Sequence, residues 1–232
     1  MPLPTRPVFG LLGGLSAVCL TVHLLAARET YYDFLIWNLF LAWLPLLFSS
    51  AALVLNGRRR LGAAGLVMAV LGAAWLLLLP NSPYILTDLI HLTVRKSIYS
   101  EAGRLGLSYW TDLLHIFTFA WTGILLGVLS LYQFQYIVYS RTNEALSWLF
   151  VLLVSVLSGY GILLGREYRL NSWDVLRHPK AVVDVVRDTL EPSAITLCLF
   201  FGTVILMMYV TIHALIRLTV RYTRQRPYGI DP

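Results

Sequence analysis

The chain has 232 residues, of which 58% are hydrophobic and 13% are charged, and its formal net charge is +6. A soluble globular protein normally carries about 25% charged residues, so the composition excludes a water-soluble domain and indicates a lipid bilayer as the solvent. Nucleic-acid binding is not indicated either, because the arginines are scattered at the ends of apolar runs and form no basic stripe with stacking aromatics.

Six apolar runs are each long enough to cross a bilayer, which takes a helix of roughly 20 residues. They predict an all-α, polytopic membrane protein with a single integral membrane domain over residues 1–232. The first run is longer than a usual signal-peptide core of about 7 to 15 residues, so it is expected to be a retained span. The expected helices cover about 8–27, 34–55, 61–79, 110–132, 145–164 and 194–216.

The third run is interrupted at residues 80–83, where the sequence reads Pro-Asn-Ser-Pro. A helix that continued to residue 92 would be about 48 Å long at 1.5 Å per residue, well beyond a hydrocarbon core of about 30 Å. The sequence therefore predicts that the helix breaks here. A short interfacial or re-entrant helix is expected after Pro83, with Ser82 as its N-cap.

Polar residues in this short helix share one stripe. Tyr84, Thr87, Asp88 and His91 follow the spacing i, i+3, i+4 and i+7, which places them on one helical face. An aspartate and a histidine at a membrane face are suited to acid/base chemistry. Asp88 and His91 are therefore the candidate catalytic residues.

A similar hexapeptide opens the fourth expected helix, since TDLLHI at 111–116 echoes TDLIHL at 87–92. The two Asp-x-x-His pairs are suited to a zinc or iron ion, or to a proton relay. In the alternative interpretation, the aspartates pair with arginines and only hold the bundle together. The candidate metal ligands are Asp88, His91, Asp112 and His115.

The most polar stretch of the chain, GREYRLNSWD, occupies residues 165–174. Arg166 and Arg169 are three residues apart, and two guanidiniums at an interface are suited to bind a phosphate or a carboxylate, or to neutralise the aspartates. Asn171 or Ser172 is expected to cap the turn that follows. The candidate substrate- or anion-binding residues are Arg166, Arg169, Asn81, Tyr84, Thr87, Asn171, Trp173 and Asp174.

Residues 181–191 predict an amphipathic interfacial helix, because their charged residues share one stripe and their valines avoid it. Six spans place both termini on one side, where arginines concentrate in short loops and the tail, so the termini are expected in the cytoplasm. The polar stretches then all fall on the opposite side. His23 and His213 are expected to be packed rather than functional. Close helix packing is expected at Gly123, Gly127, Gly159, Gly161 and Gly165.

Two motifs, PNSPYILTDLIHL and, about eighty residues later, LLGREYRLNSWD, resemble the bacterial membrane-protein family known as domain of unknown function 1361. The resemblance covers roughly the second to the sixth helix. It implies a multi-spanning protein of the bacterial inner membrane with no established activity. His115 is not among the residues that carry it, which are Asn81, Pro83, Tyr84, Thr87, Asp88, His91, Gly165, Arg166, Arg169, Asn171, Ser172, Trp173 and Asp174.

Three functions fit these observations. The first is a membrane-embedded enzyme that acts on a lipid-linked or anionic substrate at the polar face. The second is a small permease or proton-coupled transporter, and the third is a structural or assembly protein without catalysis. The expected partners are the lipid bilayer and an anionic lipid or small-molecule ligand; the sequence predicts no particular cofactor or oligomeric state.

Overall fold

All six predicted spans are present as apolar helices in the computed structural model, which describes residues 5–26, 30–57, 63–101, 104–189 and 191–225. Within that part of the chain the fold is almost entirely helical, as predicted. The three arginines at residues 58–60 lie outside the described residues. So does Leu190, which belongs to the predicted amphipathic helix. The segments suited to span a membrane are Pro7–Leu25, Phe34–Asn56, Gly65–Val94, Leu107–Arg141, Glu144–Glu167 and Pro192–Thr219.

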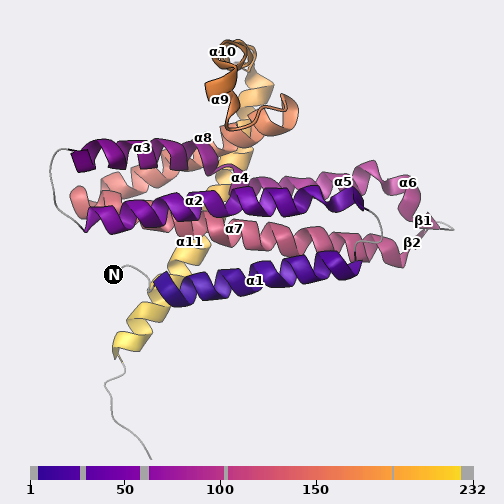
Figure 1. Cartoon of the computed structure of the whole chain (residues 1–232), viewed down its shortest axis with the longest axis horizontal. Helices are drawn as coiled ribbons and strands as arrows, with labels where there is room; N and C mark the ends of the chain where they lie inside the picture. The colour runs from indigo at the N-terminus through magenta and orange to yellow at the C-terminus, as the bar shows by residue number, and fades with distance from the viewer. Residues whose placement is uncertain (1–4, 27–29, 58–62, 102–103, 190, 226–232) are drawn as a thin grey trace, which may run out of the picture.

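Most of these helices run along the long axis of the molecule (Figure 1). Helix α7 is central, because α1, α2 and α8 all pack against it, and α3 packs on α2. Helix α11 crosses the bundle obliquely and packs chiefly on α8. The long helices are α1 (Thr5–Ala26), α2 (Phe34–Asn56), α3 (Ala63–Leu78), α7 (Leu107–Arg141), α8 (Glu144–Glu167) and α11 (Pro192–Gln225).

The short elements lie at two places. One group lies at the end of the bundle where α2 and α7 begin: η1 (Thr30–Tyr32), α6 (Lys96–Tyr99) and a two-stranded antiparallel ladder of β1 (Ser100–Glu101) and β2 (Arg104–Leu105). The other group is α9 (Asp174–Arg177) and α10 (Pro179–Asp188), which project from one side of the bundle. The second of these is the predicted amphipathic helix, and its charged residues Asp184, Arg187 and Asp188 are exposed.

The predicted break in the third span is present, but its form differs from the prediction. Helix α3 ends at Leu78 and is followed by α4 (Asn81–Tyr84), η2 (Ile85–Leu89) and α5 (Ile90–Val94). These pieces continue in the direction of α3 rather than turning along a membrane surface (Figure 1). The break is therefore a change of helix type within one span, with a 3-10 segment where a separate re-entrant helix was expected.

The predicted N-cap is wrong. Pro80 precedes α4, and no side chain caps that helix. The Ser82 hydroxyl instead donates to the carbonyl oxygen of Ala42 on α2, and the Asn81 amide donates to the carbonyl oxygen of Leu78. Side chains of the break thus satisfy carbonyls in the bundle, which a lipid environment requires of interrupted helices.

Two helices are longer than predicted. The fourth span was expected to end at residue 132, but α7 continues to Arg141 and is 35 residues long. The expectation failed because Gln133 and Gln135 were taken as a connection, whereas both accept hydrogen bonds inside the bundle, Gln133 from Ser49 and Gln135 from Tyr209. At 1.5 Å per residue α7 is about 52 Å long, so it extends beyond a hydrocarbon core of about 30 Å. The sixth helix likewise continues past residue 216 to Gln225.

Glycines allow the broken segment to lie close to its neighbours, as predicted. A Cβ on Gly161 would lie 2.5 Å from the ring of Pro80, and one on Gly123 would lie 2.6 Å from the carbonyl oxygen of Ser82. Both distances are shorter than any ordinary carbon contact. Helices α7 and α8 therefore hold the break between them, and this places the polar residues that follow it.

Candidate functional site

Asp88 and Arg166 form a buried ion pair between η2 and α8. Asp88 is 1% exposed, and its carboxylate accepts hydrogen bonds from the Arg166 guanidinium and from the side-chain amide of Asn38, the latter at 2.9 Å. The pairing of an aspartate with an arginine was one of the two sequence interpretations, and it is confirmed for this pair. Buried charges need such a partner, because an unpaired charge within a membrane span is costly.

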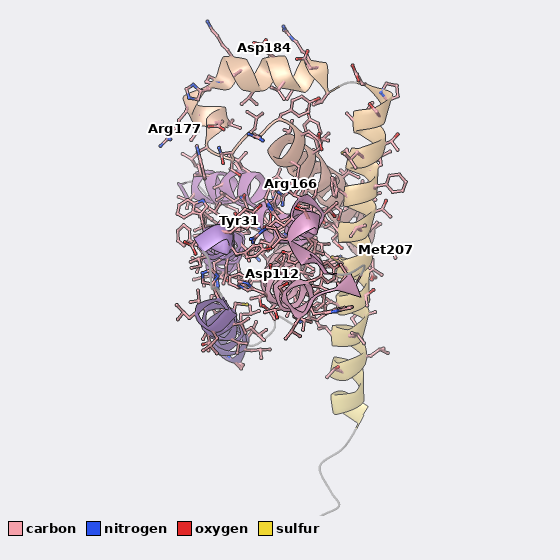
Figure 2. The ribbon with its side chains drawn as sticks, turned by 90° about the vertical axis from the view of Figure 1, so that its right-hand side faces the viewer. Tyr31, Asp112, Arg166, Arg177, Asp184 and Met207 are labelled. Atoms are coloured by element: carbon pink, nitrogen blue, oxygen red, sulfur yellow. The ribbon has the colours of Figure 1, made fainter. Side chains whose placement is uncertain are left out.

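Arg166 is held from several directions. Its Nε donates to the Thr87 hydroxyl, and its guanidinium carbon lies 4.1 Å from the centre of the Tyr84 ring, a cation–π contact. Figure 2, which looks along the bundle, shows Arg166 among the helices. The side chain is 18% exposed. The predicted stripe therefore meets the arginine motif through Tyr84, Thr87 and Asp88.

His91, the fourth member of the stripe, faces the turn before α2. Its Nδ1 is 3.1 Å from the Tyr31 hydroxyl, and its ring lies 4.8 Å from that of Phe34. The Arg95 guanidinium lies over the Tyr31 ring, 4.3 Å from its centre. Among the hydrogen bonds of the described residues, none joins His91 to Asp88, so the predicted acid/base pair is not hydrogen-bonded.

A second polar cluster lies where α7 begins. The Tyr99 hydroxyl donates to the Asp112 carboxylate at 2.6 Å, the Tyr32 hydroxyl donates to the same oxygen at 3.0 Å, and the two hydroxyls are 2.8 Å apart. Both tyrosines are buried. The turn before α2 is thereby tied to α6 and to the start of α7. The Asp112 carboxylate therefore binds two tyrosine hydroxyls, which the sequence did not predict.

Burial raises the pKa of Tyr99, and its hydrogen bond to Asp112 raises it further; burial is also the main cause of the raised pKa of Tyr32. Because the folded-state pKa exceeds that of the unfolded chain, the neutral tyrosines contribute stability that is complete below about pH 10 and is lost as the pH rises above it. We expect the melting temperature of the purified protein to fall as the pH rises from about 10 to about 12. In Tyr99→Phe this alkaline loss should be smaller, although the variant is less stable at pH 8. An equally steep loss in the variant would contradict the assignment.

The four candidate metal ligands do not meet. Asp88 binds Arg166, His91 contacts Tyr31, Asp112 binds tyrosines, and His115 contacts His23 on α1, 3.2 Å between ring nitrogens. No group of three or more histidine, cysteine or acidic residues suited to a metal ion is found among the described residues. The sequence echo between the two hexapeptides therefore produces two separate clusters.

A cavity of about 300 Å³ lies between α2, the end of α3, α8 and the loop that follows α8. We call it the Arg169 cavity, after the one charged residue in its lining. Four of the predicted anion-binding residues, Asn81, Tyr84, Arg169 and Asn171, line it together with Ser172. Its remaining walls are Trp37, Asn38, Leu41, Leu77, Pro80, Gly161, Leu164, Gly165, Leu170, Val175 and Val182.

The loop that closes the cavity is attached to α3. The Ser172 hydroxyl donates to the carbonyl oxygen of Leu77 and accepts from the Asn81 amide at 3.1 Å. Neither Asn171 nor Ser172 caps α9, contrary to the prediction; the Asp174 carboxylate instead accepts from the backbone N–H of Asn171 at 2.7 Å. Trp173, a predicted ligand residue, is outside the cavity lining and packs against Trp37.

The sequence interpretation missed several residues of these clusters. Asn38, Tyr32 and Tyr99 were not among the candidate residues, although each binds one of the two aspartates. His23 is packed, as expected, but it also bridges His115 and Asp33. A polar residue inside an apolar run was the signal available for Asn38 and His23. Their partners could not be identified from it, because they lie 50 and 92 residues away in the sequence.

A comparison with protein families gives a match to the model described as protein of unknown function (DUF1361), over residues 37–208. The match covers more than half of the chain and includes both motifs, but not the segment that carries His23 and Asp33. No curated protein and no solved structure matches the chain.

Proposed function

The chain belongs to the DUF1361 family, and on that premise we propose that it is a membrane protein that binds an anionic, lipid-linked ligand in the Arg169 cavity. The single observation that supports this function is the charge of the cavity. Among its lining residues the only ionisable cation or carboxylate is Arg169. An arginine in a cavity whose other lining residues carry no charge favours a phosphate or carboxylate ligand.

The backbone at Arg169 supports the same proposal. Its φ is 55°, in the left-handed region that favours glycine, at the turn that ends α8. Placing a non-glycine residue there costs about 1 kcal/mol. Such costs tend to persist where the side chain has a function. Arg169 is one of the residues that line the cavity.

The other walls of the cavity favour an amphiphile over a free inorganic anion. The side-chain carbonyl oxygens of Asn38 and Asn81 are suited to accept hydrogen bonds from ligand hydroxyls, because their amide nitrogens already donate within the protein. Trp37 and Leu77, which also line the cavity, are apolar residues with 53% and 36% of their surface exposed, on helices that span the membrane. A ligand with an anionic headgroup and an apolar chain satisfies both kinds of wall.

The ion pair of Asp88 and Arg166 has a supporting role in this proposal. Neither residue lines the cavity, but Arg166 packs on Tyr84, which does. The pair therefore fixes one wall of the cavity. The acid/base role of Asp88 and His91 stays a prediction, and the proposed function is binding.

The test uses Arg169→Gly, which removes the side chain and suits the left-handed backbone, so its melting temperature should not fall. Purified protein in nanodiscs of a zwitterionic lipid is titrated with a short-chain anionic phospholipid, its zwitterionic counterpart and inorganic phosphate, and binding is followed by tryptophan fluorescence. We expect the wild type to bind the anionic phospholipid most tightly and the variant to bind it about tenfold to a hundredfold more weakly.

Arg177→Gln is the matched control, because Arg177 is an exposed arginine on α9 outside the cavity lining. Figure 2 shows it on the same side of the bundle as α10. The Arg177→Gln variant should bind the anionic phospholipid as tightly as the wild type does. Equal affinity in Arg169→Gly and wild type, or equal losses in both arginine variants, would overturn the proposed site. Tighter binding of inorganic phosphate than of the phospholipid would overturn the lipid-linked ligand.

A further inference from the structure

A chain of three hydrogen-bonding groups leads from the surface into the interface between α1 and α7. Asp33, whose side chain is 57% exposed, lies 3.2 Å from Nε2 of His23. The other ring nitrogen of His23, Nδ1, lies 3.2 Å from Nε2 of His115. The two histidines are 4% and 1% exposed. Water therefore reaches the carboxylate, and the imidazoles continue the path inward.

The exposed carboxylate determines the tautomers of both rings. An ionised carboxylate only accepts hydrogen bonds, so Nε2 of His23 carries a proton and donates it to Asp33. Nδ1 of neutral His23 is then an acceptor, and Nε2 of His115 must be the donor. This leaves the lone pair of His115 on Nδ1. Each ring thus holds one proton that faces its outer neighbour.

The surroundings of the two rings favour one extra proton at a time. Both are covered by aromatic rings, since Tyr32 and Phe119 each lie within 6 Å of the His115 ring centre. Two imidazolium ions in contact within such an apolar environment would repel strongly. Among the described residues, the charged and titratable groups nearby are Asp33 directly before α2, Asp112 of α7 with its two tyrosines, and Arg95 over the rings of Tyr31 and Tyr32.

We propose that Asp33, His23 and His115 form a proton relay between water and the α1–α7 interface. A proton that binds Nδ1 of His115 releases the Nε2 proton of that ring to Nδ1 of His23. The Nε2 proton of His23 then passes to Asp33, whose carboxylate becomes a carboxylic acid that can release it to water. The reverse sequence carries a proton inward from Asp33 and restores the first pair of tautomers.

The interface continues inward with further polar groups. One turn beyond His115, the Cys19 thiol lies 3.4 Å from the carbonyl oxygen of Thr118 and 3.2 Å from the Thr122 hydroxyl. These groups belong to the same two helices as the histidines. The relay is the component that a proton-coupled process would require, and it does not depend on the Arg169 cavity.

The test is nitrogen NMR of protein labelled at its five histidines. Nitrogen chemical shifts distinguish protonated from unprotonated ring nitrogens. In the wild type near neutral pH, we expect His115 to carry its proton on Nε2. In Asp33→Asn the amide at this position can donate as well as accept, so we expect both tautomers of His115. A wild-type His115 protonated at Nδ1 would overturn the relay.

A second measurement separates a relay from a static contact. Near the midpoint of its titration, the exchange of His115 between neutral and protonated forms is followed by line broadening. A positioned acid/base group typically accelerates proton transfer by about a hundredfold or more, so Asp33→Asn and His23→Gln should slow this exchange by about that factor.

His178→Gln removes an exposed histidine between α9 and α10 and should leave the exchange unchanged. Arg169→Gly should also leave it unchanged, which separates the relay from the proposed ligand site. Wild-type exchange rates in both Asp33→Asn and His23→Gln would overturn the proposal.

Discussion

Asp88→Asn is expected to destabilise the folded protein by about 3–5 kcal/mol, because it leaves the Arg166 guanidinium buried without a counter-charge. The replacement keeps the size of the side chain and one acceptor oxygen, so the lost term is mainly electrostatic. Arg166 also packs on Tyr84 and Thr87, and cannot leave the site without exposing both. The measurement is the free energy of unfolding in detergent micelles, by denaturant titration followed by tryptophan fluorescence.

The matched double variant, Asp88→Asn with Arg166→Gln, removes both charges and should recover more than half of that loss. Replacing a whole buried pair by neutral groups is usually far less costly than removing one partner. Glu144→Gln is the surface control: Glu144 and Arg217 form an exposed pair at 3.3 Å, and its loss should cost less than about 1 kcal/mol. Equal losses of unfolding free energy in Asp88→Asn and Glu144→Gln would show that the buried pair contributes no more stability than the exposed pair.

The spans could be predicted because a bilayer requires about 20 apolar residues for each crossing, a local property of the chain. Errors arose where polar residues lie inside the bundle. Gln133 was taken to end a helix, but it accepts hydrogen bonds from Ser49 and Ser50 on α2. Local sequence does not show that a neighbouring helix satisfies a polar side chain. Helix ends are therefore predicted less well than helix existence.

The candidate site was likewise predicted only in part: the polar stripe was found, but most partners on other helices were not. Helical periodicity placed Thr87 and Asp88 on one stripe, and the cost of a buried charge required a cation, which the structure identifies as Arg166. Periodicity does not determine partners between helices, so the two tyrosines that bind Asp112 could not be predicted from the similar motif. The link from His23 to His115 depends on how α1 packs on α7, and no pattern within either helix encodes it.

Helix packing offers the second large effect, at the contact between α8 and α11. Gly159→Ala is expected to destabilise the protein by about 1–3 kcal/mol, the usual cost of an overpacked contact. A Cβ on Gly159 would lie 2.5 Å from both the carbonyl oxygen of Cys198 and the backbone nitrogen of Gly202. Backbone atoms cannot move aside as a flexible side chain can, so α11 would have to move away from α8.

Gly13→Ala is the control for helix propensity. Gly13 also lies within a helix, but a Cβ there meets nothing within 4 Å. In a helix interior, alanine is favoured over glycine by up to about 1 kcal/mol, so this variant should be as stable as the wild type or more so. The two substitutions are chemically identical, and their free energies of unfolding should change in opposite directions. If Gly159→Ala changed the free energy of unfolding by as much as Gly13→Ala does, the close approach of α8 and α11 would be wrong. The oblique course of α11 would then lose the contact that best explains it, since α8 is the helix on which it chiefly packs.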